Sequence, residues 1–331
     1  MSFYNFTNNK RISKTLKKSI NDILLTGNKF KARAYSKALE SLEFNQKTEI
    51  TLDNVDSLIK FKSVGKSAIK IIKKILNGDD IDMLTEEQRQ KVMSLENLTT
   101  LYGVGLSAAN KWLDMGIHNL QELQEEFTSG NVKLTSAQKL GLQYYDDLHT
   151  RIPQKEIDDL GKILINLSKQ VDPTMEVILA GSYRRYMNLP KKIRNKKTSG
   201  DIDILIIHPE LVTKQQVKSS SILKDLYKKL NKIPEHYGKL ALGSTKYSGL
   251  VALESCPIRH LDIRLFPAES KIPSILHFTG SGMFNQQIRA HALTLGYTLS
   301  EYHLKLSLFS QNNQNLSLQL VAEIHLLQSY E

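Results

Sequence analysis

Hydrophobic positions in the first half of the chain recur at the spacing of an α-helix. The pattern covers residues 12–24, 34–42 and 120–150, where apolar residues return every three or four positions. Residues 61–68 (FKSVGKSA) and 101–108 (LYGVGLSA) resemble each other, and each predicts a short glycine turn that opens a helix. The spacing is clearest at Ile12, Leu16, Ile20, Ile23 and Leu24.

Beyond about residue 150 the pattern changes to short β-branched runs. Pro153 marks the break, because proline disfavours helix in the residue before it. Residues 177–180, 202–207 and 261–266 are rich in Ile, Leu and Val and predict strands. The expected fold class is therefore multidomain, with an all-helical front half joined to an α+β back half.

Composition adds a basic front to this picture. The chain has 331 residues, is 40% hydrophobic and carries a net charge of +11. Residues 1–78 hold 16 Lys and Arg against 6 Asp and Glu, so most of the excess lies there. Such a surface suits a polyanion, and nucleic acid is the expected partner, with a lysine-rich domain without a partner as the alternative.

Two absences narrow the class of protein. No run of about 18 apolar residues is present, which predicts no membrane span. The single cysteine, Cys256, excludes an internal disulfide and a cysteine-built zinc site. A reducing compartment is expected, and both the nucleus and a viral cytoplasmic factory or virion are compatible with it.

Three aspartates are the candidate catalytic residues. Asp201 and Asp203 stand two apart at a predicted strand, so their side chains project from one face, while Ile202, Ile204 and Ile206 face the other. Adjacent like charges are costly unless a cation neutralises them. Asp262 is expected on a neighbouring strand, and three such carboxylates form the two-metal clamp used in phosphoryl transfer, with Mg²⁺ or Mn²⁺ as the ion.

The segment before these aspartates predicts a phosphate site. Gly181, Ser182 and Arg185 follow the predicted strand 177–180 and open a helix, where free N–H groups favour phosphate oxygens. Ser182 adds a hydroxyl, and Arg185 adds a planar fork of donors. A strand, a GS pair, a helix and then a DxD form the core of a nucleotidyltransferase.

At this point the sequence resembles the family X DNA polymerases, in particular their beta-like members. The resemblance runs from about residue 10 to 330 and is strongest at 277–293 (HFTGSGMFNQQIRAHAL) and 296–302 (GYTLSEY). It implies four parts: a helical lyase-like domain with a helix-hairpin-helix motif (1–85), a thumb-like DNA-binding subdomain with a second such motif (86–150), a nucleotidyltransferase palm (151–264) and a nucleotide-selecting, fingers-like α+β subdomain (265–331).

The resemblance also implies roles for individual residues. Asp201, Asp203 and Asp262 match the metal-binding catalytic carboxylates, and Asp262 is the one expected to help activate the primer 3′-hydroxyl. The expected contacts of the incoming dNTP are Arg151, Gly181, Ser182, Arg185, Phe278, Gly280 and Asn285. The expected DNA contacts are Lys31, Arg33, Tyr35, Val64, Gly65, Gly103, Val104, Gly105, Arg264 and Arg289.

The two glycine turns resemble helix-hairpin-helix elements, which bind DNA backbone with a monovalent cation, Na⁺ or K⁺. For a 5′-deoxyribose-phosphate lyase, the family places a nucleophilic lysine where this chain has Ile71. A one-residue gap gives Lys70 instead, so either Lys70 is the nucleophile or the lyase is lost. Loss of borohydride trapping in Lys70→Ala would support the gapped alignment.

Four features depart from the family pattern. His277 stands where an aromatic is usual, and Gly282 where the family has an acidic or variable residue, so sugar selectivity and fidelity stay open. His260 replaces a basic residue beside Asp262. An insertion, 186–199, carries five basic residues between 191 and 197. It is either a mobile solvated loop or a segment that grips DNA or the triphosphate.

The expected function is template-directed filling of short gaps or nicks in duplex DNA by a monomer, as in base excision repair. The alternatives are a template-independent terminal transferase and a catalytically dead DNA-binding scaffold. The short segment 237–249, where terminal transferases carry a long strand-blocking loop, favours templating. The three aspartates argue against the scaffold.

Overall fold

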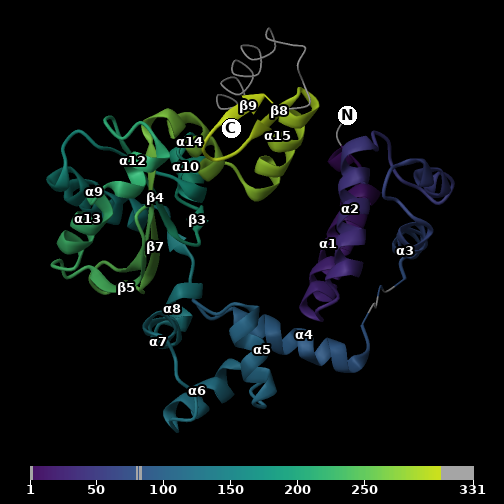
Figure 1. Ribbon diagram of the computed structural model, residues 1–331, viewed down its shortest axis with the longest axis horizontal. Coiled ribbons are helices and arrows are strands. Elements are labelled where there is room, and N and C mark those ends of the chain that lie inside the picture. The colour runs from purple at the N-terminus through teal and green to yellow at the C-terminus, as the bar shows by residue number, and fades with distance from the viewer. Residues whose placement is uncertain (1–2, 80, 82–83, 307–331) are drawn as a thin grey trace. The chain divides into compact units, whose positions relative to one another are not determined.

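The computed structural model describes residues 3–79, 81 and 84–306. Contacts within the chain divide it into two compact units, Met1–Lys133 and Leu134–Glu331. Figure 1 shows a first unit of helices and a second unit built around a sheet. The part of the predicted fingers-like subdomain beyond residue 306 lies outside the described residues.

The first unit is entirely helical in its described part, as the hydrophobic spacing predicted. Ile12, Leu16, Leu42 and Ile72 are among its fully buried residues and join α1, α2 and α3 in one core. The helices are α1 (Thr7–Leu25), α2 (Lys29–Asn45), α3 (Lys66–Asn77), α4 (Glu86–Thr99), α5 (Leu106–Asp114) and α6 (Leu120–Thr128), with short 3₁₀ helices η1 (Phe3–Asn5) and η2 (Val55–Lys60).

The two similar segments form the same turn. Gly65 and Gly105 are the N-caps of α3 and α5, with nearly equal backbone angles. Two residues before each cap the backbone is left-handed, with φ of 72° at Ser63 and 78° at Gly103. Glycine adopts this conformation freely, whereas serine has a Cβ that crowds the following carbonyl oxygen. The first copy of the turn therefore holds backbone strain that the second lacks.

We expect Ser63→Gly to stabilise the first unit by about 0.5–1 kcal/mol, because it removes that strain at some cost in chain entropy. Denaturant unfolding followed by fluorescence of the single tryptophan, Trp112 in α5, is the measurement. The reverse change, Gly103→Ser, is the matched control and should destabilise by a similar amount. A loss of stability in Ser63→Gly would contradict the assignment of strain.

The second unit combines a five-stranded sheet with helices and two small sheets. Its helices are α7 (Ser136–Gln143), α8 (Tyr145–His149), α9 (Gln154–Val171), α10 (Gly181–Tyr186), α11 (Lys191–Arg194), α12 (Lys214–Ser219), α13 (Ile222–Leu230), α14 (Lys271–Thr279) and α15 (Gly282–Thr294), with the 3₁₀ helix η3 (Ala268–Ser270). Its strands are β1 (Ile152–Pro153), β2 (Glu176–Leu179), β3 (Thr198–Ser199), β4 (Ile202–His208), β5 (His236–Leu242), β6 (Lys246–Val251), β7 (Arg259–Pro267), β8 (Tyr297–Leu299) and β9 (Leu304–Leu306). The strands predicted at 177–180, 202–207 and 261–266 are thus β2, β4 and β7, although Ala180 lies just past the end of β2.

The main sheet has the strand order β2-β4-β7-β6-β5. Strands β4 and β7 are parallel, and the other neighbours are antiparallel. One face packs on α9 and α13 through Ile202, Ile204 and Ile206. Leu205 and Ile207 are also buried, on the other face, against Phe266. The predicted pairing of a buried face with a charged face therefore holds only at the start of β4, next to the aspartates.

Contacts place residues 134–150, the end of the thumb-like subdomain expected from the sequence, in the second unit. Leu140 of α7 packs against the β5 glycine, Gly238, at a distance that leaves no room for a side chain there. Leu140 also belongs to a cluster with Leu250 and Ile258 of the sheet region. Residues 134–150 therefore pack with the sheet rather than with the helical unit.

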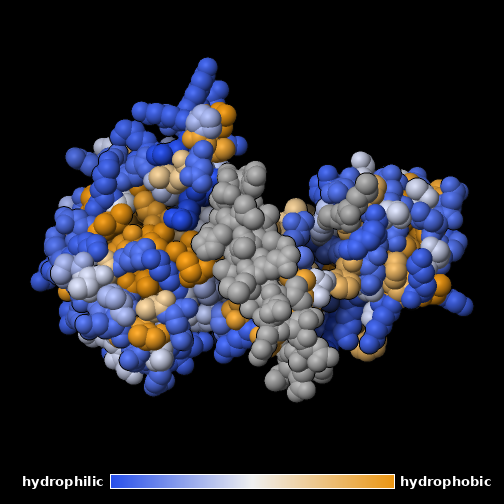
Figure 2. Space-filling model, turned by 90° about the horizontal axis from the view of Figure 1, so that it is seen from above, coloured by the Kyte–Doolittle hydropathy of each residue, from blue (hydrophilic) through white to orange (hydrophobic). Residues whose placement is uncertain are grey.

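Figure 2 shows hydrophilic residues over much of the coloured surface, in keeping with the lysine-rich composition, together with a hydrophobic patch at the left of the view. Among the helices in the described part of the chain, none is both long enough and apolar enough to cross a bilayer.

Candidate active site

The sheet register brings two of the predicted aspartates together. Asp203 of β4 lies directly opposite Asp262 of β7 in the parallel pair. Neighbouring strands run about 5 Å apart, so side chains at opposed positions on one face lie close together. Asp201 immediately precedes β4 and acts electrostatically on Asp203. The three aspartates expected from the sequence thus lie together on the neighbouring inner strands β4 and β7 and just before β4.

Gly181 allows the start of α10 to approach this cluster. A Cβ built on Gly181 would lie 2.0 Å from Oδ2 of Asp203, and its φ of 61° is left-handed. The backbone N–H of Ala180 donates to the carbonyl of Asp203 at 2.9 Å, which fixes β4 against the helix start. The GS pair is therefore structurally coupled to the DxD pair.

We expect Gly181→Ala to lower nucleotidyl transfer at least about 100-fold, because the new methyl group would have to displace the Asp203 carboxylate. Steady-state kinetics of nucleotide addition measure the effect. Gly243→Ala in the β5–β6 turn is the control, since a Cβ there meets its nearest neighbour at an ordinary 3.6 Å. Activity near wild type in Gly181→Ala would mean that the carboxylate position is not critical.

The electrostatics of the cluster favour a bound cation. Burial, together with the charges of Asp201 and Asp262, raises the pKa of Asp203 to about 7. Lys246 of β6 places its Nζ 2.8 Å from Oδ2 of Asp262. Oδ1 of Asp262 is buried and accepts no hydrogen bond from the described residues, with His260 Nε2 at 3.4 Å. An orphaned carboxylate oxygen beside a repelled carboxylate is a fitting ligand set for a divalent cation.

Among the described residues, no three His, Cys, Asp or Glu side chains converge to enclose a single metal ion. Mg²⁺ in proteins commonly takes one or two carboxylates and completes its shell with water and substrate phosphates.

His260 is held beside Asp262 by β6. Its Nε2 lies 2.8 Å from Oγ of Ser248, and burial lowers its pKa while the charge of Asp262 opposes that shift. Ser248 faces Asp262 in the β6–β7 register. The basic side chain usual at this position is thus replaced by a histidine that is oriented by a hydroxyl.

Two arginines connect the carboxylates to α14. Nη1 of Arg185 donates to the carbonyl of Thr279 at 2.8 Å, and the guanidinium of Arg264 lies 5.7 Å from the centre of the Phe278 ring. Both arginines oppose the rise in the pKa of Asp203. Arg264 was expected to contact DNA, and the structure places it near Asp203 and against Phe278.

The predicted nucleotide pocket on α14 and α15 is tied together at His277. Asn285 Nδ2 donates to the His277 carbonyl at 2.7 Å, and Arg289 Nη2 lies 3.1 Å from His277 Nδ1. Burial, followed by the charge of Arg289, lowers the pKa of His277. Gly280 has no room for a side chain, because Phe284 lies against it, whereas Gly282 opens α15 in free space. Phe278, Gly280 and Asn285 thus lie in one region with Arg185.

Arg151 lies at the other flank of the aspartates. Its Nε donates to Oγ1 of Thr198 at 3.2 Å, and its Nη1 lies 3.1 Å from the position of a Cβ on Gly200. The residue is exposed, and Ile152 next to it pairs with Ser199 in the β1–β3 sheet. Arg151 is therefore held at the end of the insertion, against Gly200, the residue that precedes Asp201.

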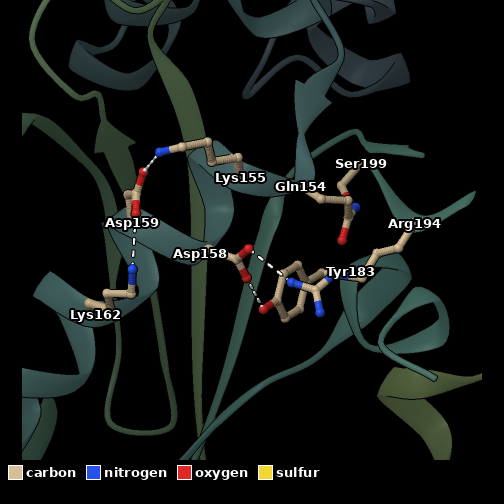
Figure 3. A network of polar contacts seen from close by, with 8 residues as sticks. All are labelled: Gln154, Lys155, Asp158, Asp159, Lys162, Tyr183, Arg194 and Ser199. Carbon is tan, nitrogen blue, oxygen red and sulfur yellow. Dashed lines mark hydrogen bonds and ion pairs between the residues drawn. The ribbon is translucent and has the colours of Figure 1, made fainter. Parts of the chain in front are cut away.

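The insertion is anchored rather than free. Arg194 donates to Asp158 of α9 at 2.9 Å, and the Tyr183 hydroxyl donates to the other oxygen of the same carboxylate. Burial and this bond raise the pKa of Tyr183 to about 12. Figure 3 shows both side chains directed at Asp158, with Gln154 reaching Ser199 nearby. A freely mobile loop, one of the two interpretations of the sequence, does not fit these contacts.

The predicted DNA and lyase residues of the first unit lie in different settings. Tyr35 is buried and its hydroxyl lies 2.8 Å from Oγ of Ser67, whereas Lys31 is half-buried and Arg33 is exposed. Lys70 is exposed on α3, and Ile71 beside it packs partly against the core. The lysine candidate is therefore not desolvated, which leaves nearby cations as the other way to obtain a neutral, nucleophilic amine.

Sequence reasoning missed Lys246 and Ser248, which touch Asp262 and His260 from β6. It also missed Glu156 of α9, which binds the buried Arg259 at the start of β7 through two bonds of 2.6 and 2.9 Å. None of these residues belongs to a motif, and only the strand register and helix packing bring them to their partners.

Comparisons with known proteins agree with this geometry. Residues 151–268 match the family model described as DNA polymerase beta palm. Residues 96–149 match the fingers domain of DNA polymerase lambda, and 274–325 match the DNA polymerase beta thumb. These names for the flanking parts are the reverse of the labels thumb-like and fingers-like used above, although they refer to the corresponding segments.

Similar proteins include DNA polymerase lambda of Arabidopsis thaliana, 27% identical over 88% of this chain and 54% of the relative. DNA polymerase lambda of Rattus norvegicus is 28% identical over 84% of this chain and 46% of the relative. The chain thus spans about half the length of the curated relatives it matches. The three matched domains and these relatives together place the protein in the DNA polymerase beta and lambda family, family X.

Proposed function

We propose that the protein is a template-directed DNA polymerase that fills short gaps in duplex DNA, as in base excision repair. The observation that carries the proposal is the pairing of Asp203 with Asp262 across β4 and β7, against the start of α10. Such an arrangement suits addition of a dNTP to a primer 3′-hydroxyl by in-line phosphoryl transfer.

Polymerases of this family use divalent metal ions, and Asp201, Asp203 and Asp262 are the residues proposed to hold them. Two bound Mg²⁺ ions, or Mn²⁺, would neutralise the charge that develops on the transferring phosphoryl group. Asp262 is proposed to accept the proton of the primer hydroxyl through its orphaned oxygen. Ser182 and Arg185 are proposed to bind the triphosphate, Arg185 through the donors that Thr279 leaves free.

The DNA contacts belong to the same proposal. The turns at Val64–Gly65 and at 103–105 are proposed to bind phosphates of the duplex through main-chain N–H groups, each with a monovalent cation. Their matching geometry, with Gly65 and Gly105 as helix N-caps, supports an equal role for both turns. Neither turn would distinguish one DNA sequence from another.

The hairpin between β5 and β6 favours templated synthesis over terminal transfer. Only residues 243–245 separate the two strands, and the N–H of Gly243 donates to the carbonyl of Lys246 at 2.8 Å. A connection this short cannot extend into the position of a template strand. We do not extend the proposal to a lyase, because Lys70 is exposed.

Primer extension in Mg²⁺ tests the proposal with two substrates, a one-nucleotide gap bearing a 5′-phosphate and an unpaired single strand. Efficient insertion of the template-matched nucleotide in the gap is expected, with little extension of the single strand. Extension without a template would support a terminal transferase. No extension of either substrate, with retained DNA binding, would leave a DNA-binding scaffold.

A further inference from the structure

The insertion between α10 and β3 holds a cluster of lysines on a structured base. Lys191 and Lys192 lie in α11, and Lys196 and Lys197 follow it. All four are exposed, and none forms an ion pair with an acidic residue in the described part of the chain. Lys197 lies over the Tyr186 ring, with its Nζ 5.6 Å from the ring centre.

The fifth basic residue has a different use. Arg194 is half-buried and binds Asp158, a carboxylate that also accepts the buried Tyr183 hydroxyl. Because the charge of Arg194 is neutralised by Asp158, the uncompensated positive charge of the segment lies on the four lysines. Figure 3 shows the anchor between α9 and the insertion.

The two ends of the insertion are also fixed. It begins at the end of α10, the helix of Ser182 and Arg185, and it returns through β3, which pairs with β1. Thr198 accepts from Arg151, and Ser199 is reached by Gln154. The lysines are therefore held in place beside the helix and strand that flank the aspartates.

A fixed cluster of like charges is unfavourable by itself. Four ammonium groups within seven residues repel one another, and that repulsion destabilises the segment unless a polyanion is bound. A solvated loop would relieve the repulsion by spreading, but the Arg194 anchor restrains it. Exposed lysines, which act as point charges with free rotation, suit a phosphate backbone better than a compact group that must be oriented.

We infer that the insertion is a clamp for the phosphate backbone of duplex DNA, held in position by the Asp158–Arg194–Tyr183 anchor. This inference rests on the proposed function and adds to it a DNA-binding surface. The clamp contacts phosphates only, so it binds all sequences alike.

The test is the salt dependence of binding to a fluorescent gapped duplex, measured by anisotropy without nucleotide. The variant carries Lys191, Lys192, Lys196 and Lys197 all changed to Gln. The slope of log K against log salt is negative, and each lost phosphate contact makes it shallower by about 0.9. We therefore expect the magnitude of the slope to fall by about 2–4 in the variant, with DNA affinity about 10-fold lower near 0.1 M salt. The change should be equal for duplexes of different sequence.

The matched control changes four lysines of the α12–α13 region, Lys218, Lys224, Lys229 and Lys232, to Gln. It has the same net charge as the test variant, and its slope should stay at the wild-type value. An unchanged slope in the test variant, or an equal decrease in both, would overturn the clamp. So would a weaker affinity for a labelled dNTP with DNA binding unaltered, which would assign the lysines to the triphosphate.

The anchor gives a second test, in which net charge and the loss of the anchor predict opposite changes in DNA affinity. Asp158→Ala makes the protein more positive, so charge alone predicts tighter DNA binding. Release of Arg194 predicts weaker binding, by about 2- to 5-fold, and that is the expected result. Tighter or unchanged binding would overturn the anchored clamp. If the four-lysine variant shows the expected slope change relative to wild type, yet wild type fails to extend a primer, the clamp stands and the polymerase proposal falls. If wild type does not bind gapped DNA, both fall.

Discussion

Changing Asp262 to Asn should lower nucleotide insertion at least about 1,000-fold while leaving the affinity for gapped DNA within about 2-fold of wild type. The amide keeps the size of the side chain but removes the charge that faces Asp203 across the sheet. It also replaces one of the two carboxylate oxygens by an amide nitrogen, which donates hydrogen bonds and does not bind a metal ion. A loss of several kcal/mol of transition-state stabilisation corresponds to this rate effect. Single-turnover kinetics on a one-nucleotide gap measure it.

A control separates catalysis from net charge. Glu254→Gln removes one exposed carboxylate from the connection between β6 and β7, and it should leave the insertion rate unchanged. Lost DNA binding in Asp262→Asn would show instead that the carboxylate supports the fold of the site. An insertion rate within 10-fold of wild type would remove Asp262 from the proposed catalytic set.

The largest expected effect on stability comes from Glu156→Ala. Glu156 and Arg259 are both buried and joined by two charged hydrogen bonds, and Arg259 also donates to the carbonyl of Thr150. Removing one partner leaves a buried unpaired charge, which costs about 3–5 kcal/mol. The melting temperature of the second unit should fall by about 10 °C. Thermal unfolding followed by far-UV circular dichroism measures it, with Trp112 fluorescence as a report on the first unit.

Two further variants sharpen this result. Asp159→Asn breaks a half-exposed pair with Lys155 and Lys162 on the same helix and should leave the transition nearly in place. The double change of Glu156 and Arg259 to Met should recover most of the loss, because apolar residues of similar volume replace buried pairs well. A double variant as unstable as Glu156→Ala would mean that packing, and not charge, is the cause.

Much of the site could be predicted from the sequence because its signals are local. The GS pair, the DxD pair and the strand patterns occupy short windows, in which helical and strand periodicities differ clearly. The same windows predicted the candidate carboxylates and the α+β back half. The glycine turns at Gly65 and Gly105 were visible for the same reason, since two similar segments predicted two similar structures.

The rest depended on contacts that no local pattern records. Asp203 and Asp262 are 59 positions apart, and only the parallel register of β4 and β7 sets one opposite the other. Lys246 touches Asp262 because β6 lies beside β7. The positive charge of the insertion was visible in the sequence. Its fixed position depends on the bond between Arg194 and Asp158, which lie 36 positions apart.

The amino-acid sequence by itself thus determined the elements, their order and the residue types that carry the chemistry, because backbone preference and apolar periodicity act over a few residues. The tertiary structure alone decided which charges are paired and which remain free. It buried Glu156 with Arg259, joined Arg194 to Asp158, and paired one oxygen of Asp262 with Lys246 while the other, Oδ1, accepts no hydrogen bond from the described residues. The physical reason is that desolvation and the strength of a charge pair depend on what packs around them, which is settled only when distant segments meet.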